Sequence, residues 1–92
     1  MRKLLRPIKI KIFYDDRLQR ITGKSFEEAI VSKNLTFVQF LNFIFSSYPE
    51  IHQKFHPGTL GFLLNDRPPT EDEVLKNNDE VKFMSDVSFI QD

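Results

Sequence analysis

The segment from Thr36 to Tyr48 carries the strongest helical pattern in the sequence, and this pattern constrains the fold more than any other feature. Thr36 is a good N-cap residue, and Gln39 three positions later completes a capping box. Leu35 and Phe40 have the spacing of a hydrophobic staple across that cap. The sequence therefore predicts a helix with a defined start at Thr36.

Large apolar residues recur along this helix at helical spacing and form a single stripe. The stripe consists of Phe37, Leu41, Ile44, Phe45 and Tyr48. We interpret it as a core-facing surface and not as a cofactor site, because stripes of this kind normally pack against another layer. Pro49 should end the helix, since the residue before a proline is disfavoured in the helical conformation. Residues 51–58 are then expected to form a loop or a short irregular turn.

Four strand-like segments flank the helix, two on each side: 8–14, 26–32, 60–64 and 81–84. The first alternates Ile with Lys, which is the pattern of a half-buried strand, and the third is a continuous apolar run. The order strand, strand, helix, strand, strand predicts an α+β domain of two layers. We expect one main helix packed across a four- to five-stranded mixed sheet. The residues expected to be buried are Phe37, Leu41, Ile44, Phe45, Leu63, Val81 and Phe83.

Short polar segments that favour turns connect these elements. They are Asp15-Asp16, Gly23-Lys24, Asn65-Asp66 and Asn77–Asp79, and residues 18–22 between the first two are expected to lie in a loop. Residues 70–73 have the composition of a cap followed by a short helical turn. The whole chain, residues 1–92, is predicted to be a single domain with an N-terminal extension at 1–7 and a flexible C-terminal tail at 87–92.

The composition argues against several classes of function. Lys plus Arg total 13 and Asp plus Glu total 13, so the chain lacks the excess positive charge that general nucleic-acid binding requires. No cysteine is present, which removes disulfides, thiolate metal sites and a cysteine nucleophile. No apolar run approaches the roughly 20 residues that span a bilayer, and no signal-peptide pattern follows the basic N-terminus. We therefore expect a cytoplasmic protein that contacts neither nucleic acid nor membrane.

Candidate catalytic and metal-binding groups are few. His52 and His56 lie four residues apart, but prolines flank the pair and no third ligand is evident nearby. The carboxylates of Asp15-Asp16 and of residues 71–73 are explained by turn and helix-start positions. We expect no metal site, no cofactor and no enzymatic activity.

Four parts of the chain resemble the small, sulfur-carrier subunit of molybdopterin synthase. Leu18–Lys24 is similar to a leucine–arginine–glycine loop of that family, and Leu63–Asp66 to its valine–asparagine turn. Thr36–Leu41, followed by Tyr48–Ile51, resembles its helix and the tyrosine–proline–glutamate exit. Val74–Phe83 resembles the leucine–lysine–aspartate–glycine–aspartate–glutamate–valine signature before its last strand. These parts follow the family's order, and the resemblance implies the β-grasp fold of ubiquitin and of the thiamin-pathway sulfur carrier.

The chain departs from this family at its C-terminal segment. Family members finish with proline–proline–valine–serine–glycine–glycine, and an activating enzyme adenylates the terminal glycine before it becomes a thiocarboxylate. The matching positions here are Ser85–Ile90, with Phe89 and Ile90 in place of the two glycines. Glycine suits this role because a tail without side chains can thread a narrow tunnel. We therefore expect that this chain does not form a thiocarboxylate.

The first candidate function is a protein-interaction module that keeps the carrier fold as a docking surface and uses an apolar tail as an anchor. Met84 should point outward, because Val81 and Phe83 take the inward positions of its strand. The expected partner-binding residues are Met84, Val87, Ser88, Phe89 and Ile90.

The alternative function is an authentic sulfur carrier in molybdopterin biosynthesis with an atypical C-terminus. A third, weaker hypothesis is the small subunit of a tungsten- or molybdenum-enzyme assembly. In each case the resemblance implies a protein partner, such as a molybdopterin-synthase large-subunit-like protein or an activating enzyme.

Overall fold

The computed structural model describes residues 6–55 and 59–85. The elements in chain order are β1 (Pro7–Tyr14), α1 (Asp16–Thr22), β2 (Phe26–Ser32), α2 (Phe37–Ser47), α3 (Pro49–Lys54), β3 (Gly61–Leu64) and β4 (Asp79–Met84). The predicted strands and the predicted main helix are present, and α1 and α3 are additional helices.

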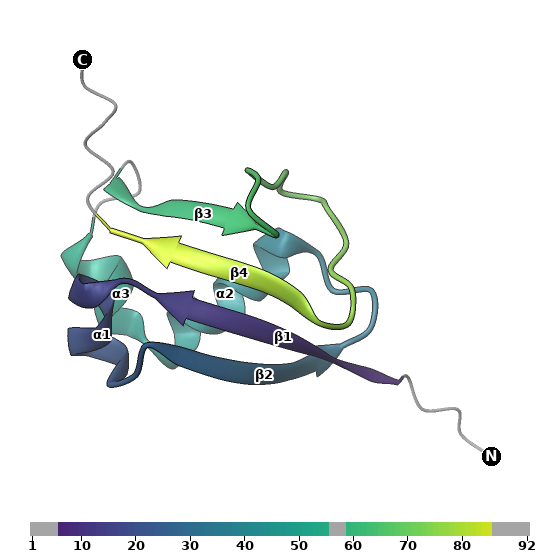
Figure 1. The fold of residues 1–92 in the computed structure, drawn as a ribbon, viewed down its shortest axis with the longest axis horizontal. Coiled ribbons are helices and arrows are strands. Elements are labelled where there is room, and N and C mark those ends of the chain that lie inside the picture. The colour runs from purple at the N-terminus through teal and green to yellow at the C-terminus, as the bar shows by residue number, and fades with distance from the viewer. Residues whose placement is uncertain (1–5, 56–58, 86–92) are drawn as a thin grey trace.

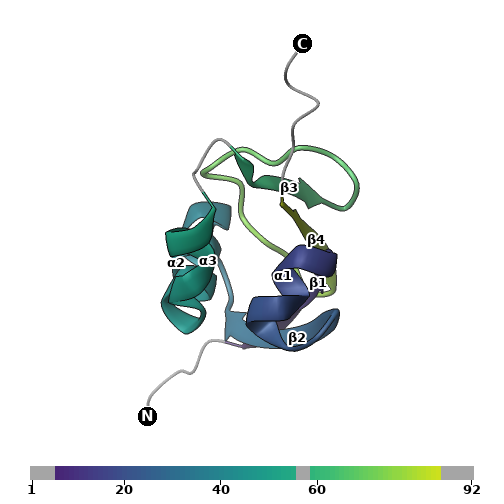
Figure 2. The same cartoon turned by 90° about the vertical axis from the view of Figure 1, so that its left-hand side faces the viewer.

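The strands form one mixed sheet in the order β2-β1-β4-β3. The two central strands, β1 and β4, are parallel, while β2 is antiparallel to β1 and β3 is antiparallel to β4. Helices α2 and α3 lie against one face of the sheet, and α1 lies at one end of it (Figure 1, Figure 2). No helix of the described residues covers the opposite face, which we call the outer face. This is the ubiquitin-like β-grasp arrangement that the sequence predicted.

Strand alternation determines which side chains enter the core. Ile10 and Ile12 of β1 are 0% exposed, whereas Lys11 between them has the outward parity. Ile12 lies opposite Val81 of β4, which is also fully buried, so the central strands present one apolar surface to α2. Full burial of each such side chain contributes roughly 1.5–3 kcal/mol, so this surface is a main source of the stability of the fold.

The structure confirms most of the predicted core, namely Phe37, Ile44, Val81 and Phe83. The prediction is wrong for Leu63, which is half-buried. Its neighbour Leu64 is buried instead, because Leu64 lies opposite Val81 in the β3–β4 register, whereas Leu63 lies opposite the outward-facing Lys82.

Helix α2 begins as predicted and buries a slightly different face from the one expected. Both hydrogen bonds of the capping box form: Thr36 N donates to Gln39 Oε1 at 2.9 Å, and Gln39 N donates to Thr36 Oγ1 at 3.3 Å. Phe40 is fully buried between the capped end and the sheet. Leu41 and Phe45, expected to be buried, flank this contact and remain half-buried.

Two segments that were expected to be irregular are helices. Residues 18–22 belong to α1, because Asp15 acts as an N-cap and Gly23 closes the helix in the left-handed conformation, with φ at 79°. Pro49 ends α2 as predicted, but it also opens α3, where a proline at the first helical position needs no hydrogen-bond partner. Conversely, residues 70–73 form a hydrogen-bonded turn and not a turn of helix.

Candidate partner-binding site

The end of β4, from which the C-terminal segment departs, is fixed by the side chain of Asp15. One oxygen, Oδ2, accepts hydrogen bonds from Ser85 N at 2.6 Å and from Ser85 Oγ at 2.8 Å. The other oxygen, Oδ1, accepts the capping bond from Leu18 N at 3.0 Å. The Ser85 side chain is buried. A single carboxylate therefore joins the start of α1 to the last described residue of the chain.

The charge state of Asp15 suits this role. Partial burial acts to raise the pKa of its carboxyl, but the hydrogen bonds donated by Ser85 and Leu18 outweigh it and lower the pKa below the ordinary value. Asp15 is consequently ionised at neutral pH, and its hydrogen bonds are of the charge-assisted, stronger kind. The point where the tail leaves the domain is thus held in place.

Met84, the one predicted partner-binding residue within the described part of the chain, lies on the outer face as expected. It is half-buried, and with Phe13 and Lys82 it lines a shallow hollow of about 170 Å³. The alternation of β4 buries Val81 and Phe83 on the opposite face. The prediction for the orientation of Met84 is confirmed.

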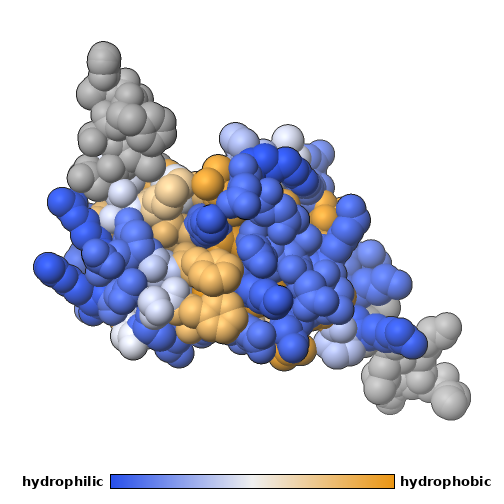
Figure 3. All heavy atoms as spheres, in the orientation of Figure 1, coloured by the Kyte–Doolittle hydropathy of each residue, from blue (hydrophilic) through white to orange (hydrophobic). Residues whose placement is uncertain are grey.

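Two aromatic residues that the sequence analysis did not single out extend this surface. Phe13 and Phe26 lie opposite each other in the β1–β2 register, with ring centroids 5.0 Å apart, and Phe26 is 40% exposed. Together with Leu63 and Met84 they form what we call the outer patch. Figure 3 shows apolar side chains gathered on this face among hydrophilic ones. Phe13 occupies the same strand parity as the outward lysines of β1, and this signal was available in the sequence.

The other predicted site residues, Val87, Ser88, Phe89 and Ile90, lie outside the described residues. The structure therefore places only the root of the tail. Ser85 directly follows Met84, so the tail starts at the margin of the outer patch.

A second polar cluster lies on the inner side of the sheet, where Glu27 Oε2 accepts hydrogen bonds from Tyr14 Oη at 2.6 Å and Tyr48 Oη at 2.9 Å. Burial, and then the neighbouring carboxylate, raise the pKa of Tyr14 far above its ordinary value, so this phenol stays protonated. Glu27 Oε1 also lies 3.5 Å from Lys24 Nζ, so both oxygens of the carboxylate have partners within the cluster. Its hydrogen bonds connect β1, β2 and the end of α2.

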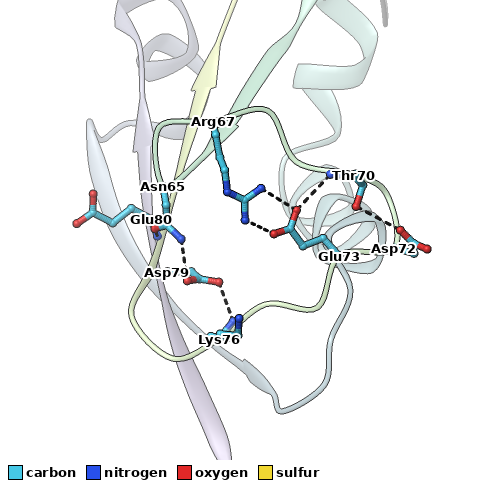
Figure 4. Close-up of polar contacts among 8 residues, drawn as sticks. All are labelled: Asn65, Arg67, Thr70, Asp72, Glu73, Lys76, Asp79 and Glu80. Carbon is cyan, nitrogen blue, oxygen red and sulfur yellow. Dashed lines mark hydrogen bonds and ion pairs between the residues drawn. The ribbon is translucent and has the colours of Figure 1, made fainter.

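The long connection between β3 and β4 is also held by polar contacts (Figure 4). Arg67 forms a two-pronged ion pair with Glu73, and Asp79 accepts hydrogen bonds from Asn65 Nδ2 at 3.0 Å and Lys76 N at 2.7 Å. Asn65 has a positive φ of 52°, as its predicted turn position requires. These carboxylates all have intramolecular partners, so we interpret the cluster as a set of contacts that fixes the conformation of the loop.

Within residues 6–55 and 59–85, no group of three His, Cys, Asp or Glu side chains has the arrangement of a metal site. The ring of His52 stacks on Phe45 with a centroid distance of 5.2 Å, and His56 lies outside the described residues. None of the helices described is both long enough and apolar enough to cross a membrane.

No protein-family profile and no curated protein matches the sequence. Solved structures do resemble it. A protein described as molybdopterin converting factor, subunit 1, from Pyrococcus furiosus superposes with a TM-score of 0.77 and 20% identity, covering 87% of this chain and 99% of that one. Small archaeal modifier protein 1 from Haloferax volcanii gives a TM-score of 0.74 and 15% identity, covering 87% and 99%.

A further match is the small archaeal modifier protein 1 from Methanosarcina acetivorans, with a TM-score of 0.68 and 18% identity over 90% of this chain and 97% of that one. At such low identity these likenesses establish the ubiquitin-like fold, and they do so over nearly the full length of each solved chain. The fold alone does not fix a function.

Proposed function

We propose that this protein is a ubiquitin-like protein-interaction module that docks through its outer patch and uses the segment after β4 as an anchor. The observation that carries the proposal is the Asp15–Ser85 contact, which fixes the root of the tail beside Met84 and the Phe13–Phe26 pair. A rigid root next to an exposed apolar surface allows one partner to contact both at once.

The physical character of the outer patch supports docking. Phe26 leaves 40% of its surface in water, and Met84 and Leu63 are half-buried, so a partner can remove further apolar area from solvent. Aromatic and methionine side chains are enriched at the centres of protein interfaces. Full burial of one large apolar side chain contributes roughly 1.5–3 kcal/mol, part of which is lost to ordering on association.

We also propose that this protein does not transfer sulfur. When the chain is compared with molybdopterin-synthase small subunits, which it resembles, Phe89 and Ile90 occupy the positions of the two C-terminal glycines of those proteins, where the thiocarboxylate forms. Side chains of this size conflict with passage through a narrow tunnel, whereas they suit an apolar groove on a partner. A tail with this chemistry serves as an anchor.

The second candidate is an authentic sulfur carrier of molybdopterin biosynthesis, supported by the likeness to a structure described as a molybdopterin converting factor subunit. Under this alternative the partner is a synthase large subunit or an activating enzyme, and the tail enters its active site. The two candidates share a protein partner and differ in whether the tail is modified.

Calorimetric titration with a purified molybdopterin-synthase large subunit, and separately with an activating enzyme, tests the docking surface. We expect Phe26→Lys to weaken the binding at least tenfold, because it places a charge within the outer patch. Val38→Lys is the matched control, since Val38 is similarly exposed, at 38%, but lies on α2. Equal binding by both variants would contradict the assigned surface.

A further inference from the structure

The outer edge of β2 is an open strand edge. Among the described residues β2 pairs only with β1, and it forms one end of the sheet. Its charged residues, Glu27 and Glu28, lie at its first half, and residues 29–32 carry no proline and no charged side chain that would block edge pairing. The backbone groups on this edge are available to an added strand.

An apolar groove runs beside this edge, between β2 and α2. A hollow of about 400 Å³ is lined by Pro7, Ile30, Val31, Ser32, Leu35 and Phe43. A smaller hollow of about 160 Å³ shares Ile30 and Phe43 and extends to Tyr48, where Glu27 and Glu28 also line it and make this end acidic. Ile30 is 62% exposed and Phe43 is 46% exposed, so an added strand would find apolar contacts on both of its faces.

Positive charge marks one end of the groove. Pro7 and Ser32 are opposite each other in the β1–β2 register, so the adjacent Arg6 and Lys33 emerge at the same end. Both are exposed, and neither forms an ion pair with any other described residue. An extended segment that fits this surface combines alternating apolar side chains with an acidic residue at its end.

We infer that the groove receives residues 86–92 of a second copy of this chain, added as a strand to the edge of β2. This segment reads Asp-Val-Ser-Phe-Ile-Gln-Asp, in which Val87 and Phe89 fall on one side of an extended strand and Ile90 on the other. Val, Ile and Phe are favourable strand residues. The acidic residues at both ends, Asp86 and Asp92, allow one of them to meet Arg6 and Lys33 in either strand direction.

The occupant is a second copy because the tail of the same chain cannot reach the end of the groove where Arg6 and Lys33 lie. Ser85 is held by Asp15, which follows Tyr14 at the C-terminal end of β1, whereas Pro7 is at the N-terminal end of that strand. The eight residues of β1 span roughly 23 Å at about 3.3 Å per residue. Asp92, the last residue of the tail, lies seven residues beyond Ser85 and extends at most roughly 23–25 Å from it. The far end of β2 is a further two strand spacings, about 10 Å, across the sheet from β4, so a tail that also passes around the sheet falls short of it. A tail from another molecule has no such restriction.

This inference goes beyond the proposed function, because it assigns a receptor surface for the tail on the protein itself. Binding in the groove and binding to another protein compete for the same tail. The two proposals can nevertheless fail separately, since the groove and the outer patch share none of their lining residues.

Sedimentation velocity on four full-length chains tests the inference. The natural chain should self-associate as its concentration rises from about 10 μM to about 1 mM, the weak range typical of a small interface. Two variants should remain monomeric. Phe43→Glu places a charge in the groove, and the double substitution Phe89→Ser with Ile90→Ser removes the large apolar side chains of the tail. Leu63→Lys, in the outer patch but on β3 and away from β2, should associate like the natural chain.

Mixing the two monomeric variants gives the decisive result. The Phe43→Glu chain retains a working tail, and the Phe89→Ser, Ile90→Ser chain retains a working groove, so together they should form a one-to-one heterodimer. Circular dichroism checks that each variant is folded, and Ile30→Lys replaces Phe43→Glu if the latter is not. A natural chain that stays monomeric throughout, variants that associate as it does, or a mixture that fails to pair would each overturn the inference.

Discussion

Tyr14 donates a 2.6 Å hydrogen bond from its hydroxyl to Glu27 Oε2, an oxygen that also accepts a hydrogen bond from Tyr48. The bond crosses from the central strand β1 to the edge strand β2, and Tyr48 adds the end of α2. Tyr14 is 4% exposed, so water does not readily replace its partner. This contact holds the edge strand and the helix at a fixed separation, and the groove beside β2 depends on that separation.

Removal of the Tyr14 hydroxyl should therefore destabilise the fold. We expect Tyr14→Phe to lower the free energy of unfolding by about 1.5–3 kcal/mol, the range for a hydrogen bond to a charged group. Tyr48→Phe, which removes the second donor from a more exposed ring, should cost less. Urea unfolding followed by circular dichroism measures both, and an equal or reversed ranking would show that burial does not govern the contribution.

Stability should fall in acid because two structural carboxylates have lowered pKa values. For both Asp15 and Glu27, burial acts to raise the pKa, but hydrogen bonds outweigh it: from Ser85 and Leu18 to Asp15, and from two tyrosines to Glu27. A carboxyl whose folded pKa is depressed stabilises the protein above its unfolded pKa, about 4, and this contribution is lost as the pH falls through the folded pKa.

Thermal unfolding between pH 7 and pH 2 measures this effect. The melting temperature should decline once the pH drops below about 5, and Asp15→Asn should flatten part of that decline while lowering the melting temperature at pH 7. A melting temperature that does not change between pH 5 and pH 3 would contradict the assignment of these two carboxylates.

Core substitutions should differ between two residues of α2 that the sequence treats alike. Ile44 is 2% exposed, so Ile44→Ala should lower the free energy of unfolding by about 2–5 kcal/mol through the cavity that it leaves. Leu41 is half-buried beside the sheet contact, and Leu41→Ala should cost less. Equilibrium denaturation of the two variants provides the comparison, and a larger loss for Leu41 would mean that the helix is rotated from the orientation described.

The elements with a strong local pattern could be predicted from the sequence. The alternation of Ile and Lys predicts β1 to within one residue of its start, and the Thr36–Gln39 capping box predicts the start of α2. The partial burial of Leu63 and the full burial of Leu64 could not be predicted, because a continuous apolar run leaves the register open. The helix α1 was missed because Asp15 suits a turn as well as an N-cap.

Only part of the candidate site could be predicted from the sequence. The outward orientation of Met84 follows from strand parity and is confirmed. The pairing of Phe13 with Phe26 depends on the register between two strands, and the bond from Ser85 to Asp15 spans 70 residues. Neither contact has a local signal. The anchoring role of Val87–Ile90, the cytoplasmic location and the identity of the partner stay predictions.

The intact mass of the protein after incubation with an activating enzyme, ATP and a sulfur donor shows whether its C-terminus can accept sulfur. The control is a chain in which Phe89 and Ile90 are replaced by a terminal Gly-Gly, and this variant should gain the mass of one oxygen-to-sulfur exchange. We expect the natural chain to keep its mass under conditions that convert the control. Conversion of the natural chain would rule out a purely anchoring tail and identify the protein as a sulfur carrier.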